Sequence, residues 1–169
     1  TLRTVSDGIV ELDLSNSSVR QLGAMGGMAL RALILADSKV SSLPLMVDVP
    51  LELLNLRNTE IRNFMSLSRL RLKNLDLGGT KIQTLDVIKN MPLVVLNLER
   101  VEIDDRDLSV LSEIGTLAHL NLSGTKITTI SPIKKLRLQT LELGGCRSLN
   151  DFSSLSDMPL SRLGLSRDG

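Results

Sequence analysis

The sequence has almost no aromatic residues, with two Phe and no Tyr or Trp among 169 residues. A single Cys excludes a disulfide framework within the chain. The net charge of +1 offers no basis for binding nucleic acid or anionic lipid. The longest stretch without Asp, Glu, Lys or Arg runs 12 residues, from Ile114 to Thr125, whereas a membrane-spanning helix needs roughly 20. These absences argue against membrane insertion, nucleic-acid binding and a disulfide-stapled fold.

Leucine takes the place of the missing residue types and supplies 36 of the 169 residues. Hydrophobic residues make up 42% of the chain, which is far too much aliphatic surface for a disordered protein. A core filled almost wholly by Leu, Ile, Val and Met has one recurring side-chain shape. Such a composition indicates that the chain is built from internal repeats.

The pattern L-x-x-L-x-L, with Ile accepted at its first position, occurs eight times in register. The copies begin at positions 9, 30, 51, 72, 93, 117, 138 and 160. The intervals between them are 21, 21, 21, 21, 24, 21 and 22 residues. The sequence therefore predicts a single repeat domain, 1–169, of about seven and a half repeats, which we expect to be part of a larger protein.

The two halves of each repeat have different hydrophobic periods. The L-x-L segment has the period of two that is typical of a β-strand. Apolar residues then recur in steps of three, as in Leu85, Ile88 and Met91, which suits a 3₁₀-helix. Because each return segment brings the chain back by one strand spacing, the strands are predicted to be parallel. The fold class is therefore an α/β solenoid.

This pattern resembles the leucine-rich repeat family over residues 9–169, and most closely its short class of 21–22 residues. That class includes the bacterial internalins and a regulatory subunit of protein phosphatase 1. The resemblance implies a right-handed superhelix with a parallel sheet on its concave face and short 3₁₀ or α segments on its convex face. One column, meaning one position of the repeat taken across successive repeats, departs from the Asn that is usual in the family. Its residues are Ser17, Ser38, Thr59, Thr80, Val101, Thr125 and Cys146.

The fifth repeat has 24 residues, which predicts a true α-helical turn in its return segment. Asp104 is predicted to be the N-cap, with Asp105 and Asp107 in the first turn, where the helix dipole favours negative charge. A calcium loop is the alternative for these aspartates, but the Gly and the distal Glu of such a loop are missing.

Residues able to perform catalysis are sparse. The only Cys, Cys146, and the only His, His119, belong to different repeats, and a nucleophile needs a base within hydrogen-bond reach. No Cys-x-x-Cys or His pair offers a zinc site. We therefore predict that the chain is not an enzyme and binds no cofactor and no metal.

A candidate partner-binding surface remains on the concave face, at the third, fifth and seventh positions of L-x-x-L-x-L-x. Aliphatic residues at these positions expose apolar surface that typically marks an interface. The fifth column is rich in Asp, Asn and Glu, which predicts a line of hydrogen-bond acceptors suited to a partner with a basic surface. The candidate residues are Ile34, Leu53, Asn55, Arg57, Asp76, Val95, Asn97, Glu99, His119, Asn121 and Glu142.

The leading functional hypothesis is a non-catalytic module, part of a scaffold or regulator, that binds another protein. Alternatives are a surface adhesin or receptor ectodomain, and the substrate-recognition part of an enzyme whose catalytic domain lies elsewhere. Extracellular repeats of animal type usually carry Cys-rich caps, so the lack of such caps favours a cytoplasmic location over the cell surface. No capping segment is evident at either end of the repeats.

Overall fold

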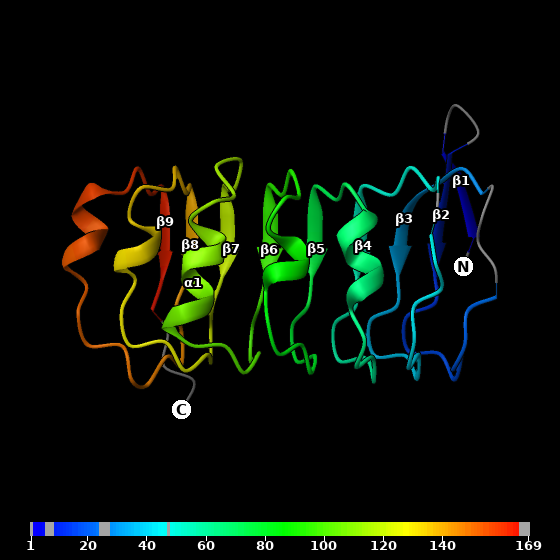
Figure 1. Ribbon diagram of the computed structural model, residues 1–169, viewed down its shortest axis with the longest axis horizontal. Coiled ribbons are helices and arrows are strands. Elements are labelled where there is room, and N and C mark those ends of the chain that lie inside the picture. The colour runs from blue at the N-terminus through cyan, green and yellow to red at the C-terminus, as the bar shows by residue number, and fades with distance from the viewer. Residues whose placement is uncertain (1, 6–8, 24–27, 47, 166–169) are drawn as a thin grey trace.

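The computed structural model describes residues 2–5, 9–23, 28–46 and 48–165, which form one sheet of nine strands in sequence order. Figure 1 shows the strands side by side along the long axis of the molecule. The strands are β1 (Leu2–Val5), β2 (Ile9–Asp13), β3 (Leu30–Ile34), β4 (Leu53–Asn55), β5 (Asn74–Asp76), β6 (Val95–Asn97), β7 (His119–Asn121), β8 (Thr140–Glu142) and β9 (Arg162–Gly164). All neighbours from β2 to β9 are parallel, as predicted.

The register of the sheet follows the sequence repeat. Leu54 of β4 pairs with Leu75 of β5, and Leu75 pairs with Leu96 of β6. The same repeat position is therefore aligned across the coils, so residues of one column form a row across the sheet. The 24-residue repeat keeps this register, because Leu96 also pairs with Leu120.

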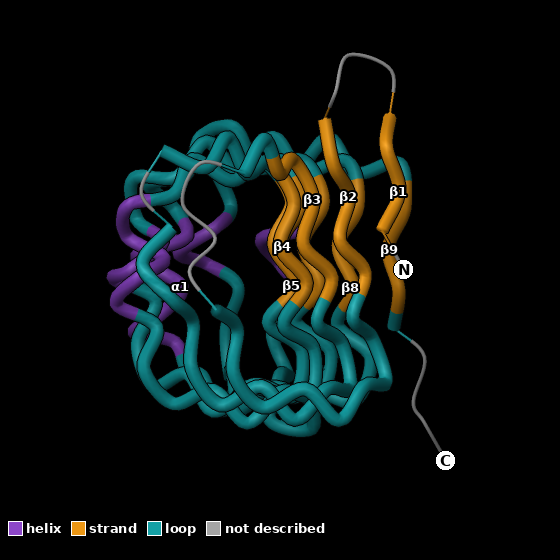
Figure 2. The backbone as a smooth tube through the Cα atoms, turned by 90° about the vertical axis from the view of Figure 1, so that its right-hand side faces the viewer, coloured by secondary structure: helices purple, strands orange, loops and turns teal. Residues whose placement is uncertain are grey.

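Short helices occupy the return half of the third to seventh coils, as the three-residue steps predict. The described return residues of the first two coils, 17–23 and 38–46, contain no helix. The 3₁₀-helices are η1 (Met65–Arg69), η2 (Asp86–Ile88), η3 (Ser131–Ile133) and η4 (Ser153–Asp157). Figure 2 shows them on the side of the coil opposite the strands. Within the described residues, no helix is long and apolar enough to cross a membrane.

The fifth coil contains the predicted α-helix, α1 (Asp105–Leu111). Asp104 accepts a hydrogen bond from the Arg106 backbone N–H at 2.9 Å, and Asp107 Oδ2 accepts one from the Asp104 N–H at 3.1 Å. Asp105 instead accepts bonds from the next coil, from the Thr128 N–H at 2.7 Å and the Thr128 hydroxyl at 2.5 Å. Burial opposes ionisation of Asp105, but these hydrogen bonds outweigh it and lower its pKa. Capping and coil-to-coil bonding therefore account for all three aspartates.

The core is an aliphatic column between the strands and the return segments. Leu54, Leu75, Leu96 and Leu120 are at most 2% exposed, and each contributes roughly 1.5–3 kcal/mol through burial. The threonines of the column that is usually Asn bond the turn backbone, as Thr80 Oγ1 does to the Leu77 carbonyl at 2.6 Å. The hydroxyls of Ser17 and Ser38 are buried and have no such partner among the described residues.

The two ends of the sheet differ. At the first edge β1 runs antiparallel to β2, so one further strand precedes the repeats. Leu12 and Leu14 of the first coil are only partly buried. The hydrophobic repeat could not predict β1, because residues 2–5 lie outside it. At the other edge, Leu163 and Leu165 are 38% and 48% exposed. Leucines at the same repeat positions of inner coils are buried, which makes the last described coil the less protected one.

Candidate functional site

The outward positions of the short strands form the concave face. In β4 to β8 the central residue is buried and its two neighbours are half-buried. This alternation places the predicted residues in rows across adjacent strands. One row contains Leu53, Asn74, Val95 and His119, and a second contains Ile34, Asn55, Asp76, Asn97, Asn121 and Glu142.

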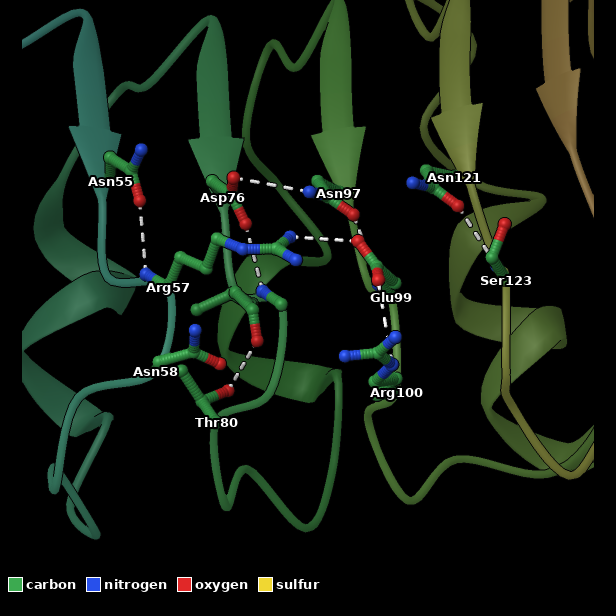
Figure 3. Close-up of polar contacts among 12 residues, drawn as sticks. Asn55, Arg57, Asn58, Asp76, Thr80, Asn97, Glu99, Arg100, Asn121 and Ser123 are labelled. Atoms are coloured by element: carbon green, nitrogen blue, oxygen red, sulfur yellow. Dashed lines mark hydrogen bonds and ion pairs between the residues drawn. The ribbon is translucent and has the colours of Figure 1, made fainter. Parts of the chain in front are cut away.

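Most carboxylates and amides of the second row bond their own backbone at the strand exit. The side-chain oxygen of Asn55 accepts from the Arg57 N–H at 2.9 Å, and that of Asp76 accepts from the Gly78 N–H at 2.8 Å. Asn97 and Asn121 do the same with Glu99 and Ser123 at 3.0 and 2.9 Å. Figure 3 shows these contacts along the row. Each is an Asx turn, in which the side-chain oxygen takes the place of a backbone carbonyl and accepts a hydrogen bond from the N–H two residues on.

The Asx turns change the chemistry that the row offers to a partner. Because each asparagine uses its oxygen internally, its NH₂ group is the part left for other contacts. Asn97 donates to Asp76 Oδ2 at 3.1 Å, whereas the NH₂ groups of Asn55 and Asn121 make no hydrogen bond with a described residue. The row therefore presents donors at these two positions, where the sequence predicted acceptors.

An ion pair joins the third and fifth coils across the concave face. Arg57 Nη1 donates to Glu99 Oε2 at 2.8 Å. The side chain crosses the fourth coil at Gly78, where a Cβ would lie 2.9 Å from Arg57 Nη1 (Figure 3). The hydrogen bond from Arg57 lowers the pKa of Glu99, and partial burial opposes that shift. The arginine is thus held over a glycine by a partner two coils away.

The aliphatic residues of the concave face do not form a continuous strip. Leu53 and Val95 are half-buried, and Asn74 lies between them in the row. Ile34 is also half-buried and lies beside Asn55 in the second row. The most exposed large apolar side chains are elsewhere in the described structure: Leu45 and Met65 are 64% and 66% exposed. Both belong to return segments, so the outward positions of the strands do not include them.

The remaining candidate residues have local partners. His119 Nδ1 lies 3.1 Å from Thr140 Oγ1, and Glu142 Oε1 lies 3.1 Å from Arg162 Nε. Cys146 is buried and donates from Sγ to the Leu122 carbonyl at 3.1 Å. The thiol and the imidazole thus have separate partners. Across the described chain, no group of three or more His, Cys, Asp or Glu residues is arranged to hold a metal.

The architecture is that of a leucine-rich repeat solenoid: parallel strands, turns bonded by threonine hydroxyls, and return segments with short 3₁₀-helices. Among solved structures, internalin C2 of Listeria monocytogenes superposes with a TM-score of 0.71 at 20% identity, covering 91% of this chain and 80% of that chain. A second Listeria internalin, inlF, gives a TM-score of 0.57 at 16% identity, covering 90% of this chain and 60% of that chain. The chain therefore spans less than two-thirds of the length of the second internalin. At these identities the likeness establishes the fold. No family model matches the sequence, and no curated protein matches it.

Proposed function

We propose that this chain is a non-catalytic protein-interaction module that binds its partner on the concave face, as part of a scaffold or regulator. The observation that carries the proposal is the ordered polar network of Arg57, Asp76, Asn97 and Glu99. These side chains point away from the core and are fixed by hydrogen bonds across three coils. A surface whose side chains are already ordered loses less conformational entropy when a partner binds.

The position of the network also supports a binding site on the middle coils of the solenoid. A coil of a solenoid packs mainly on its two neighbours, so fraying is least in the middle of the array. Leu53 and Val95 flank the network and offer apolar contacts beside polar ones. Apolar anchors surrounded by polar contacts are typical of the residues that dominate binding energy.

The proposal is tested by matched substitutions on the two faces. The concave variant combines Leu53→Arg with Val95→Arg, and the convex control combines Leu45→Arg with Met65→Arg. Both variants replace two aliphatic side chains and add the same charge. We avoid substituting Asp76, because it accepts hydrogen bonds from Gly78 and Asn97 and its loss would also affect folding.

The measurement is a pull-down from extracts of the source cells, with the retained proteins identified by mass spectrometry. We expect the concave variant to lose the proteins that the wild type and the convex control both retain, with a loss of about 2 kcal/mol or more in binding free energy. Retention by the concave variant together with loss by the convex variant would move the binding site to the return segments.

The full-length gene tests which kind of protein contains this module. A secretion signal in the full-length gene would favour the adhesin or ectodomain alternative, and an appended catalytic domain would favour the substrate-recognition alternative. In either setting the concave substitutions above keep their expected effect.

A further inference from the structure

We propose that a groove at the strand-exit edge of the fifth to seventh coils binds carboxylates of an acidic segment in the partner protein. This inference rests on the proposed protein-binding function and names a chemical property of the partner. The groove has a volume of about 430 Å³, and its lining includes Arg100, Gly124, Lys126, Gly145, Arg147 and Ser148.

Two glycines are among the residues that line the groove. Gly124 and Gly145 follow β7 and β8 in the same repeat position and have φ values of 69° and 70°. A Cβ at Gly124 would lie 3.1 Å from Arg100 Cγ, and one at Gly145 would lie 3.6 Å from the Gly124 Cα. The missing side chains let each turn pack closely on the turn before it, so Arg100 lies against Gly124 and Gly124 lies against Gly145.

Three cations also line the groove, of which two have long ion pairs and the third has none in the described part of the chain. Arg100 Nε lies 3.5 Å from Glu99 Oε1, but Glu99 bonds Arg57 at the shorter distance of 2.8 Å. Lys126 Nζ lies 3.8 Å from Glu102 Oε1, and both side chains are more than two-thirds exposed. Arg147 has no ion pair with any carboxylate in the described part of the chain. A ligand carboxylate therefore has little internal competition.

Neutral donors extend the groove toward the concave face. Asn121 uses its oxygen on the Ser123 N–H, which leaves its NH₂ group for other contacts (Figure 3). The Ser123 hydroxyl makes no hydrogen bond with a described residue, and Ser123 directly precedes Gly124. Donors and cations thus continue from the proposed binding face into the groove. A carboxylate accepts from both kinds of group, and its bonds to cations are the stronger ones.

Arg100 stands at a position where arginine is unfavourable. The corresponding residues of the other coils have the same left-handed backbone and are Asn16, Asp37, Asn58, Gly79, Gly124 and Gly145. Gly, Asn and Asp tolerate this conformation best, whereas Arg100 has a φ of 56°. Arg100 therefore adds a cation to the groove at a cost in backbone strain, so replacing it should affect binding and stability in opposite directions.

The probe is a fluorescein-labelled hexaglutamate peptide, with a hexalysine peptide as the probe of opposite charge. Binding is followed by fluorescence anisotropy at low ionic strength, where interactions between exposed charges are least screened. We expect the hexaglutamate peptide to bind the wild type. Arg100→Asn with Arg147→Gln should weaken that binding about tenfold, the order expected from losing two exposed charge pairs.

The matched control is Lys134→Asn with Lys135→Gln, which removes the same charge from the return segment of the sixth coil. We expect this control to change hexaglutamate binding much less than the groove variant. Arg100→Asn alone should bind the peptide more weakly and yet melt at a higher temperature than the wild type, which separates a lost contact from a damaged fold.

Three outcomes would overturn the inference: no binding of hexaglutamate to the wild type, equal losses in the groove and control variants, or displacement of the peptide by inorganic phosphate at constant ionic strength. The last outcome would assign the groove to small oxyanions. None of them bears on the concave proposal, which fails only if the Leu53→Arg, Val95→Arg variant keeps the protein partners of the wild type.

Discussion

The Arg57–Glu99 ion pair is the contact at the residue scale that should make stability depend on pH. Hydrogen bonding from Arg57 lowers the pKa of Glu99 in the folded protein. The pair therefore stabilises the fold fully above about pH 4.3, the ordinary pKa of an unfolded Glu. This contribution is lost as the pH falls through the lowered folded pKa, because the protonated carboxyl no longer attracts the guanidinium.

We expect Glu99→Gln to lower the melting temperature at pH 7, with the difference from the wild type shrinking as the pH falls below about 4. Thermal melts of both proteins across this range provide the measurement. Glu102→Gln is the control, because the side chain of Glu102 is 72% exposed and its ion pair is long. A Glu99→Gln deficit that stays constant down to low pH would show that packing, and not the charge, accounts for the effect.

Arg100, in contrast to Glu99, is a residue whose substitution is expected to stabilise the fold. Its left-handed backbone, with φ of 56°, is the one such position in the described coils that Gly, Asn or Asp does not occupy. We expect Arg100→Asn to raise the free energy of unfolding by about 1 kcal/mol, the cost of the left-handed conformation for an ordinary L-residue. Urea denaturation measures the change. A loss of stability would mean that the ion pair to Glu99 outweighs the strain.

At the scale of single elements, α1 depends on its N-terminal cap. Asp104 accepts from the Arg106 N–H, and Asp107 returns a bond to the Asp104 N–H. Asp104→Ala should lower the free energy of unfolding by about 1 kcal/mol, whereas Asp104→Asn should restore most of it, since Asn caps helices about as well as Asp. Urea denaturation of the three proteins makes the comparison. An equal loss in both variants would assign the effect to the ion pair between Asp104 and Arg106.

The elements divide into those that the sequence predicts and those that it does not. Periods of two and three predict the strands and 3₁₀-helices, and the 24-residue repeat predicts α1. These elements are predictable because the spacing of apolar residues in the sequence matches the positions whose side chains point into the core. The antiparallel strand β1 lies outside the repeat and has no such spacing. The Asx turns have a sequence pattern of their own, which the repeat analysis above does not use. Asn or Asp at the end of a strand is typical of a turn in which its side chain accepts from the N–H two residues on.

The concave network was less predictable than the fold. Its residues were found by their outward position, but the Arg57–Glu99 contact skips a coil and depends on the missing side chain of Gly78. The groove could not be predicted from the strand pattern, because its cations lie in the turns that follow the strands. The fold follows from apolar positions that recur in each repeat, whereas these surface contacts depend on which residues occupy neighbouring coils.

At the scale of the whole molecule, a solenoid distributes its stability unevenly along its length. A coil packs mainly on its neighbours, so an inner coil is covered on two sides. Leu75 in the fourth coil lies between β4 and β6 and is 2% exposed, whereas its counterpart Leu163 in the last strand is 38% exposed. The two residues share type, repeat position and strand context, which makes them a matched pair.

We therefore expect Leu75→Ala to lower the free energy of unfolding by about 2–5 kcal/mol, the range for a fully buried leucine, and Leu163→Ala to lower it by clearly less. Urea denaturation followed by circular dichroism measures both. The cavity left by Leu75 is enclosed by coils on either side, so it cannot be filled by solvent, whereas the side chain of Leu163 is already partly in water. Equal losses would mean that the last described coil is as well packed as the middle ones, and that stability in this solenoid does not follow position along the array.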